Sequence, residues 1–562
     1  MPVGRATMPS GPPEKTGKQL MAPLEFEYVI VGGGVAGCIL ANRLSADPAV
    51  RVLLLEAGGK DTSPLIAAPG GLLPIMMSGA HAWPYMSAPQ QHLDGRVLYL
   101  PRGKVLGGGS SINGMAYDRG FASDYDRWAQ AGNAGWSFAE VLPYFRRLET
   151  FQPADNAWHG REGPIQVTRA AQDHPFARAF LEAGHQAGYP VSDDLNGAAR
   201  DGFGAVDLTV GRGRRSSASS AYLRPVLKRR NLEVLTGALT HTIVFKENRA
   251  VGVTFSRGGL TRTASARREV ILSAGAINTP QVLMLSGVGP AAHLASHGIP
   301  VTADLPGVGQ GLQDHLATHV KYRSTKPWSM LRYLNPFRGA LAMGQYLVTR
   351  SGPLADPGMS VATFVRSAPA LEEPDIKMLL VSALFAQNGQ KMEPMHGFYA
   401  PINVARPEAR GQVTLASADP AAPPGIDQNY NGTAHDRRAM REGVRIARQI
   451  FAQPAFDGFR GEELAPGPAV RSDEEIDAHI RAAAEADYHS TSSARMGNDA
   501  MAVVDAELRV RGLLGLRVVD ASVMPHLPGG NTAIPVAMIA EKAADLVLGQ
   551  PAPPPEDPRQ RI

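Results

Sequence analysis

The residues that decide the fold are Tyr28-Val29-Ile30-Val31-Gly32-Gly33-Gly34-Val35-Ala36-Gly37. The apolar run at the start of this stretch favours a short buried strand. The glycines fit the pattern Gly32-x-Gly34-x-x-Gly37, in which the first makes a tight turn and the second admits a pyrophosphate close to the backbone. The third glycine lets the following helix pack against the strand. The stretch therefore predicts the start of a dinucleotide-binding fold.

The residues that follow support this interpretation. Residues 38–46 have the pattern of a helix, residues 51–55 that of a second strand, and Glu56 follows, 19 residues after Gly37. A carboxylate at this place can accept hydrogen bonds from ribose hydroxyls, which argues against a 2′-phosphate and hence against NADP. The alternative is a glycine-rich loop that only turns the chain, and the strand, helix and carboxylate weigh against it. The motif alone does not distinguish FAD from NAD.

Further along, the pattern mixes strands with helices. Proline-rich loops fill residues 60–125, and so much irregular chain is usually functional or packed over a ligand. We expect strands at 232–235, 242–245, 270–273, 377–381, 397–404 and 516–520, and helices at 436–450, 473–486 and 533–548. Ser472 and Glu475 have the spacing of a capping box at the start of one helix.

Composition excludes several classes of protein. Lys and Arg outnumber Asp and Glu by 56 to 52, and no basic stripe with interleaved aromatics is visible, so nucleic acid is not an expected partner. Cys38 is the single cysteine, so neither an intramolecular disulfide nor a cysteine-based zinc cluster can form, and no metal site is expected. No secretory signal or transmembrane segment is seen, so we expect a cytoplasmic protein. Residues 1–24 and 550–562 are expected to be disordered extensions.

Four further segments carry a family resemblance. They are Arg102-Gly103-Lys104-Val105-Leu106-Gly107-Gly108-Gly109-Ser110-Ser111-Ile112-Asn113-Gly114, Ser273-Ala274-Gly275-Ala276-Ile277-Asn278-Thr279-Pro280, Leu305-Pro306-Gly307-Val308-Gly309 ending at Gln313-Asp314-His315, and Leu516-Arg517-Val518-Val519-Asp520-Ala521 with Asn531 downstream. Together they resemble the glucose–methanol–choline (GMC) oxidoreductase family from about residue 26 to 549. The resemblance is closest to its choline dehydrogenase-like and primary-alcohol dehydrogenase branch.

The resemblance implies an α/β fold with two parts. One is a doubly wound, Rossmann-like domain that binds FAD, and the other is an α+β substrate domain with an antiparallel sheet. We expect the FAD-binding domain to be discontinuous, at 25–315 and 480–549, with substrate-domain insertions around 150–210, and the substrate domain to occupy 316–479.

The resemblance also implies the residues that contact FAD. Val105 and residues 113–116 would line the isoalloxazine, Leu239 would meet the adenine through its backbone, and Asp520 and Ala521 would lie near the pyrophosphate and ribityl chain. The full set is Gly32, Gly34, Val35, Ala36, Gly37, Glu56, Ala57, Trp83, Val105, Gly108, Asn113, Gly114, Met115, Ala116, Leu239, Ala274, Asp520, Ala521, Thr532 and Ala533. Some family members attach FAD covalently through a histidine where this chain has Ile112, so we expect noncovalent FAD.

The expected catalytic pair is His489 and Asn531. Oxidation of an alcohol by hydride transfer requires removal of the hydroxyl proton, which a neutral imidazole can accept. A carboxamide N–H can stabilise the alkoxide that forms. Both residues match the family's catalytic positions, although the usual His-x-x-Gly-Thr pattern reads His-Ser-Thr-Ser-Ser here. Taken separately, a histidine packed in the core and an asparagine N-cap are the alternatives, and we assign His315 and His526 structural roles.

The sequence and the resemblance thus predict an FAD-dependent enzyme that oxidises a small or medium primary alcohol to the aldehyde, with hydride transfer to flavin N5. Its electron acceptor would be O₂, a quinone or an electron-transfer protein. Two other activities of the same fold remain as alternatives: fatty-acid photodecarboxylation, suggested by residues 406–411, and hydroxynitrile lysis. No carboxylate and aromatic cage for a quaternary ammonium is readable from 316–400, so choline is not assigned.

Overall fold

The computed structural model describes residues 24–153, 156–386 and 391–561. The stretch that decides the fold forms strand β1 (Leu24–Val31), a glycine turn and helix α1 (Val35–Leu44), followed by strand β2 (Val52–Glu56). β1 pairs in parallel with β2, and its residues Val29 and Ile30 are fully buried. The helix begins earlier than residue 38, since the turn ends directly at Gly34.

A sheet of seven strands among the described residues holds this unit. It combines β1 and β2 with β12 (Leu232–Thr236), β13 (Ala238–Lys246), β14 (Arg249–Arg257), β15 (Leu260–Leu272) and β29 (Leu516–Val518). The strands β12, β2, β1, β15 and β29 pair in parallel, and β13, β14 and β15 form an antiparallel meander. β2 and the second half of β1 are buried on both faces, which accounts for their continuous apolar runs.

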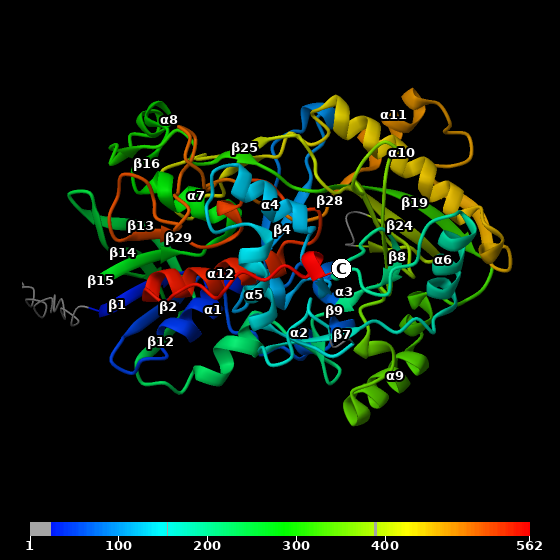
Figure 1. The fold of residues 1–562 in the computed structure, drawn as a ribbon, viewed down its shortest axis with the longest axis horizontal. Coiled ribbons are helices and arrows are strands. Elements are labelled where there is room, and N and C mark those ends of the chain that lie inside the picture. Colours follow the sequence, from blue (N-terminus) through cyan, green and yellow to red (C-terminus); the bar gives the residue numbers. More distant parts are fainter. Residues whose placement is uncertain (1–23, 154–155, 387–390, 562) are drawn as a thin grey trace, which may run out of the picture.

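A second sheet of seven strands is antiparallel throughout the described residues. Its strands are β8 (Gly202–Ala205), β19 (Leu316–Ser324), β20 (Val361–Val365), β21 (Ile376–Leu379), β24 (Gly397–Val404), β27 (Arg460–Ala465) and β28 (Glu485–Ala486). The expected fold class, a Rossmann-like sheet plus a substrate part with an antiparallel sheet, is therefore confirmed. The two sheets lie side by side along the long axis of the molecule (Figure 1).

Helices cover both sheets. They are α4 (Ala122–Gln130), α5 (Phe138–Leu148), α6 (Pro175–Gln186), α7 (Gly275–Leu285), α8 (Ala291–Ser296), α9 (Pro336–Thr349), α10 (Ala434–Phe451), α11 (Asp473–Ala483) and α12 (Ala533–Leu548). α12 packs against α1 and α5, while α10 crosses β24 of the second sheet. No helix within the described residues is long and apolar enough to cross a bilayer.

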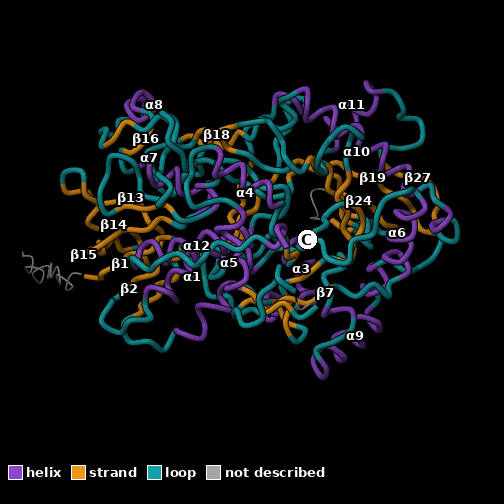
Figure 2. Tube along the Cα trace, viewed as in Figure 1, coloured by secondary structure: helices purple, strands orange, loops and turns teal. Residues whose placement is uncertain are grey.

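Short elements occupy the proline-rich region. Residues 60–125 form α2 (Pro64–Ala67), α3 (Leu72–Ser78) and the hairpin of β3 (Ala82–Met86) and β4 (Tyr99–Gly103). Minor strands elsewhere are β5 (Ala116–Tyr117), β6 (Glu149–Phe151), β7 (Ile165–Arg169), β9 (Asp207–Leu208), β10 (Val210–Gly211), β11 (Arg214–Arg215), β16 (Val288–Gly289), β17 (Ala303–Asp304), β18 (Gln310–Leu312), β22 (Phe385–Ala386), β23 (Lys391–Met392), β25 (Gly411–Thr414) and β26 (Gly425–Asp427). Loops connect most of these pieces (Figure 2).

The sheets also bear on the domain boundaries that we proposed. β8 belongs to the second sheet, which supports an insertion around 150–210. β28 also belongs to it and lies beyond our boundary at 479. The helix expected at 473–486 ends at Ala483, because the next residues turn to an extended conformation and pair with β19. Its capping box is present, with Ser472 and Glu475 bonded reciprocally.

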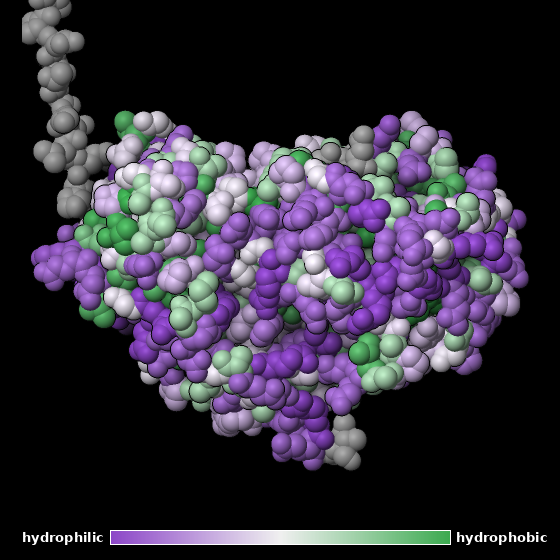
Figure 3. All heavy atoms as spheres, turned by 90° about the horizontal axis from the view of Figure 1, so that it is seen from above, coloured by the Kyte–Doolittle hydropathy of each residue, from purple (hydrophilic) through white to green (hydrophobic). Residues whose placement is uncertain are grey.

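The C-terminal residues differ from the expectation of a disordered tail. Glu556 N–H donates to Ala139 O at 2.8 Å, the Glu556 carboxylate pairs with Arg146, and Arg559 pairs with Asp126 at 2.8 Å. These contacts attach the tail to α5 and its neighbour α4. The proline-rich composition suggested disorder, but the charged side chains of the tail form ion pairs with these helices. The expected N-terminal extension, residues 1–24, lies outside the described residues except for Leu24. The face seen in Figure 3 is mainly hydrophilic, with hydrophobic side chains in small separate patches.

Candidate active site

A cavity of about 530 Å³ runs between the two sheets. We call the part beside the glycine turn of β1 and α1 the dinucleotide end, and the part beside His489 the histidine end. The lining of the dinucleotide end includes Gly32, Gly34, Val35, Ala36, Glu56, Ala57, Leu239, Thr240, Ser273 and Ala274, and that of the histidine end includes Lys377, Tyr399, Asn403, Glu485, Asp487, Tyr488, His489 and Asn531. A cavity of this size is within the range of cofactor sites.

The three motif glycines occupy the positions that the spacing requires. Gly32 has φ +100°, and a Cβ there would lie 2.4 Å from Ser273 O. A Cβ on Gly37 would lie 1.9 Å from Gly32 O, so only glycine lets the helix approach the turn. A Cβ on Gly34, in contrast, would meet only Ser273 O at 3.9 Å. Gly34 thus leaves its backbone open to the cavity, as close approach of a phosphate requires.

At the dinucleotide end of the cavity, the carboxylate of Glu56 accepts two hydrogen bonds from the backbone. Gly33 N–H donates to its Oε2 at 2.8 Å and Gly58 N–H donates to its Oε1 at 2.7 Å. Burial nevertheless raises the pKa of Glu56 to about 7. The side chain lines the cavity, so its position at the end of β2 suits a ribose hydroxyl donor.

The glycine segment at residues 102–114 contacts the first glycine segment, residues 32–37. Gly107 N–H donates to Gly33 O at 2.7 Å, and a Cβ on Gly108 would lie 2.8 Å from Gly34 Cα. Val105, which we expected to line the isoalloxazine, is fully buried in a small cluster with Ile66 and Ile75, and it is absent from the cavity lining. Its neighbour in the structure is the backbone of Gly59, with which it forms a β-bridge.

Two buried hydroxyls support occupancy of the dinucleotide end by a polar cofactor. Thr240 Oγ1 and Ser273 Oγ are buried without a hydrogen-bond partner, and both residues line the cavity. Buried polar atoms are almost always bonded in folded proteins. Hydroxyls of a bound dinucleotide could provide those partners, so the residues present fit FAD.

His489 and Asn531 meet at the other end. Asn531 Nδ2 lies 2.9 Å from His489 Nε2, although 42 residues separate them. His489 follows β28, and Asn531 lies on the loop immediately before α12. The loops thus place the imidazole and the carboxamide together on the cavity wall, as the sequence predicted.

Hydrogen bonds assign the protons of this pair. His315 Nε2 lies 2.9 Å from Ala405 O, which can only accept, so Nε2 carries the hydrogen. His315 Nδ1 is then an acceptor, 2.9 Å from His489 Nδ1, which must donate. His489 Nε2 is left with its lone pair and accepts from Asn531 Nδ2. The arrangement places a proton acceptor and a proton donor together at the cavity.

Lys377 and Asp118 fix the orientation of Asn531. The ammonium of Lys377 donates to Asn531 Oδ1 and also to Asp118 Oδ2, the latter at 3.0 Å. Asn531 N–H donates to the same Asp118 oxygen at 3.1 Å. Burial opposes ionisation of Asp118, but Arg200 and Lys377 together hold its pKa well below the usual range. The carboxamide therefore cannot flip without losing a charged partner.

Asp314 joins the two histidine loops. One carboxylate oxygen accepts from the backbone N–H of His489 at 2.6 Å and from the backbone N–H of His315 at 2.9 Å. The other accepts from the hydroxyls of Ser490 at 2.7 Å and Tyr430 at 2.9 Å. The aspartate of the Gln-Asp-His motif thus sets the distance between the two imidazoles.

The environment keeps both imidazoles neutral. Burial lowers the pKa of His489 well below its ordinary value, and the nearby His315, Lys377 and Arg102 lower it further. Burial likewise lowers the pKa of His315 to about 4. For Asp487, burial raises the pKa to about 7, with Asp314 adding to the effect against Lys377. A neutral His489 at pH 7 is the protonation state that a general base needs.

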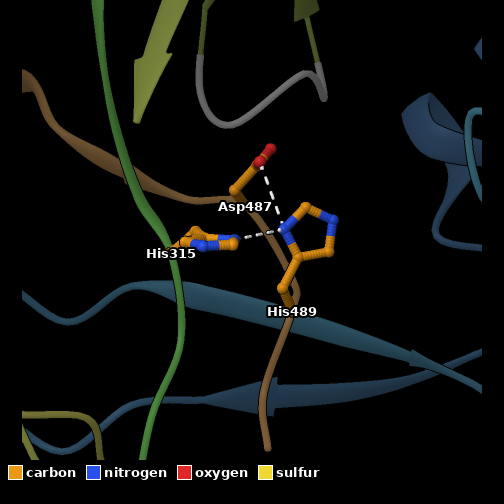
Figure 4. A group of neighbouring side chains, drawn as sticks. All are labelled: His315, Asp487 and His489. Carbon is orange, nitrogen blue, oxygen red and sulfur yellow. Dashed lines mark hydrogen bonds and ion pairs between the residues drawn. The ribbon is translucent and has the colours of Figure 1, made fainter. Parts of the chain in front are cut away.

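Figure 4 shows His315, Asp487 and His489 converging on one point. Their nearest ligand-type atoms all lie within 4.8 Å of one another, and Asp487 Oδ2 is 3.3 Å from His489 Nδ1. The hydrogen-bond scheme accounts for these contacts without a metal, because His489 Nδ1–H faces both the His315 nitrogen and the Asp487 carboxylate. The same carboxylate can stabilise positive charge on His489 once that imidazole takes up a proton.

Most residues predicted from the sequence line this cavity. The exceptions are Gly37 and Val105, and Gly37 has the packing role expected of it. Sequence reasoning assigned His315 a structural role, but its ring contacts His489 directly. It missed Lys377, whose signal was a lysine in an otherwise apolar strand, and the three aspartates 118, 314 and 487. His526 contacts Arg410 and is absent from the lining.

Comparison with known proteins identifies the family of the chain. Residues 26–317 and 407–540 match two models of the GMC oxidoreductase family. Over 529 residues the chain is 45% identical to the oxygen-dependent choline dehydrogenases of Sinorhizobium medicae and Brucella ovis, covering 94% of this chain and 96% of each relative. The chain belongs to the GMC oxidoreductase family. It is accordingly an oxidoreductase that acts on CH–OH donors, and FAD is the typical cofactor of this family.

Solved structures give the same result. Pyridoxine 4-oxidase from Mesorbium loti superimposes with a TM-score of 0.84 at 32% identity, over 92% of this chain and 98% of that one. Formate oxidase from Aspergillus oryzae superimposes with a TM-score of 0.88 at 28% identity, over 94% of this chain and 98% of that one. The names of these two enzymes refer to different compounds, although both chains superimpose on this one over more than nine tenths of its length.

Proposed function

We propose that the chain oxidises a primary alcohol to the aldehyde, with His489 taking the hydroxyl proton and Asn531 stabilising the alkoxide. The observation that carries this proposal is the 2.9 Å approach of Asn531 Nδ2 to a His489 Nε2 that has a lone pair. FAD, when bound at the dinucleotide end, would supply the hydride acceptor at flavin N5. The residues proposed to hold it are those of the two glycine segments, Glu56, and the start of α12.

The residues of the chain account for the proton transfer. A hydroxyl placed between His489 Nε2 and Asn531 Nδ2 donates its proton to the imidazole and accepts from the amide. After transfer, His489 Nε2–H and the Asn531 N–H both donate to the alkoxide. Asp487 lies beside His489 Nδ1 at 3.3 Å and stabilises the imidazolium. Lys377 prevents rotation of the Asn531 amide during the step.

An anaerobic experiment tests this proposal. Addition of a primary alcohol should bleach the flavin of the purified holoenzyme, and His489→Ala should slow bleaching by ~10²–10⁴-fold, as loss of a general base does. Unchanged bleaching in His489→Ala would exclude it as the base. Light-dependent release of hydrocarbon from a fatty acid, or release of cyanide from mandelonitrile with no bleaching by alcohols, would favour the two alternative activities instead.

Within the primary alcohols, we propose choline-like amino alcohols as the substrate class. Glu485 and Asp487 line the histidine end together with Tyr399 and Tyr488. Carboxylates and aromatic faces are the groups that bind quaternary ammonium ions. The similarity to relatives named choline dehydrogenases supports this choice. The 316–400 segment contributes the aromatic residues Phe364 and Tyr399 to the lining, and both carboxylates come from residues close to His489 in the sequence.

A neutral isostere separates charge recognition from shape. Choline and 3,3-dimethylbutan-1-ol have the same outline, but only choline carries a charge. Glu485→Gln should raise KM for choline by ~10-fold, as expected for loss of a partly buried charge pair, and leave that for the isostere unchanged. Glu462→Gln, at an exposed position outside the cavity, is the matched control. Equal effects on both alcohols would refute cation recognition by Glu485.

The acceptor and the mode of FAD attachment complete the proposal. The relatives named above are oxygen-dependent by name, so O₂ is the first acceptor to test, by assaying peroxide in air. Ile112 has no nucleophilic atom and lines the cavity, which supports noncovalent FAD. Acid precipitation should then release all of the yellow colour into the supernatant, whereas colour retained in the pellet would show a covalent bond.

A further inference from the structure

Helix α9 presents apolar side chains away from the protein. Ala342 and Tyr346 on one face are buried, and Tyr346 OH donates to Gly213 O at 3.0 Å. The apolar residues on the other faces and just before the helix are exposed: Leu334 55%, Phe337 79%, Leu341 68%, Met343 45%, Leu347 60% and Val348 84%. An amphipathic helix normally faces the protein with its apolar side. This one leaves a contiguous apolar surface in water.

The surface stands apart from the rest of the molecule. Figure 1 shows α9 at the lower edge, projecting below the second sheet. Leu260, at the start of β15, and Val301, between α8 and β17, are also exposed, and Figure 1 shows β15 and α8 at the opposite end of the molecule from α9. Scattered exposed apolar residues need no explanation, but a contiguous patch indicates an interaction site.

The segment that carries the patch is rich in cations and contains no acidic residue before Asp356. From Lys326 to Ala355 the sequence contains Lys326, Arg332, Arg338 and Arg350, with no Asp or Glu. Arg212 and Arg214 flank Gly213, which α9 contacts through Tyr346 and Arg350, and both arginines are exposed. The partner of this surface therefore combines an apolar interior with negative charge at its surface.

We propose that α9 docks the protein onto the surface of an anionic lipid bilayer. A basic amphipathic helix with Phe, Leu and Val on its apolar face lies in the plane of the headgroups and inserts those side chains at the acyl boundary. Its 14 residues are too few to span a bilayer. A second copy of the chain fits less well, because two-fold pairing of the patches would bring the arginines of both copies together.

Docking would bring the substrate part of the protein to the membrane. The 3₁₀ turn before α9, Met330–Leu334, packs into a cluster with Val381, Met359 and Tyr399. Those three residues line the cavity. The docked helix thus lies one layer outside the cavity wall. The proposal concerns where the protein binds and does not depend on the proposed chemistry.

Vesicle flotation tests the proposal with the holoenzyme. Vesicles of phosphatidylcholine with a quarter phosphatidylglycerol should carry the protein upward, and phosphatidylcholine alone should carry much less. High salt should weaken binding, as it does for surface charges. The triple variant Phe337→Ser, Leu341→Ser, Val348→Ser should bind on the order of 100-fold more weakly, because it removes most of the inserted apolar area. Leu260→Ser with Val301→Ser is the matched control and should bind like the wild type.

Two further measurements separate the charge contribution to membrane binding from the apolar one, and membrane binding from catalysis. Arg338→Glu should remove the preference for anionic vesicles while leaving the apolar face intact. Flavin absorbance and anaerobic bleaching by a soluble alcohol should be unchanged in all these variants, since none of their positions lines the cavity. Absence of flotation, or equal flotation of the triple variant and the wild type, would overturn the proposal. So would a dimer that sedimentation shows to dissociate in the triple variant, which would assign the patch to a second copy.

Discussion

The dinucleotide end of the cavity is built mainly from backbone, whereas the histidine end is built from side chains. At the first, Gly32, Gly34 and Gly108 bring three chain segments into contact. At the second, His489 and Asn531 are held by ionised and polar groups from β19, β21 and β5 and their adjoining loops. Backbone contacts depend on short local motifs, while side-chain contacts depend on the whole fold. Substitutions at the two ends should therefore have separable effects.

His489→Ala should have the largest effect, and only on chemistry. The rate of flavin bleaching should fall by ~10²–10⁴-fold because the proton acceptor is gone. The FAD content of the purified variant should equal that of the wild type, since His489 contributes to the other end. Stopped-flow absorbance measures the first quantity and the visible spectrum the second. If His489→Ala lost FAD as well as activity, the two ends of the cavity would not have separable effects.

Asn531→Ala should follow, with a fall of ~10²–10³-fold in bleaching rate, as for removal of one oxyanion donor. It also leaves Lys377 without one of its acceptors, so thermal unfolding should be measured in parallel. A variant that melts like the wild type and keeps full activity would show that the amide does not stabilise the alkoxide.

His315→Asn should lower the rate by ~10-fold and change its pH dependence, because a positioning residue acts through His489. The rate requires neutral His489, so it rises with pH through the pKa of that group. His315 is one of the groups that lower this pKa. Replacing His315 should therefore raise the pKa of His489. In a plot of kcat/KM against pH, the rise in rate should then occur at higher pH. His315→Leu, which cannot accept from His489 Nδ1, should be slower than His315→Asn. Identical pH profiles would limit His315 to packing.

Glu56→Gln should have the smallest effect, and only on the cofactor. The amide keeps the shape but weakens the bonds from Gly33 and Gly58, and charged acceptors contribute about 1.5–3 kcal/mol. FAD should dissociate about tenfold more readily on dilution, while bleaching of the enzyme that remains loaded should be unchanged. A slower bleaching step in the loaded variant would link the two ends.

The same contrast explains what could be predicted from the sequence. The glycine spacing and Glu56 predicted the dinucleotide end because each glycine is required by a neighbour close in the sequence or by one recurring turn. His489 and Asn531 were predicted only through family motifs. Lys377 and Asp118 were missed, because a lysine in an apolar strand gives no sign of its partner until the second sheet faces the first. Val105 does not line the cavity, because the motif specifies its segment and not the direction of its side chain.

One feature of the first sheet affects how the chain is made. β29 pairs with β15, and α12 packs on α1, although about 500 residues lie between the two helices. During synthesis the N-terminal strands leave the ribosome long before the segments that complete their sheet. The edge of β15 and the side of α1 that α12 covers therefore stay unpaired until the last segments of the chain emerge. Ribosome-bound chains that stop before residue 516 should accordingly stay sensitive to protease and unable to hold FAD.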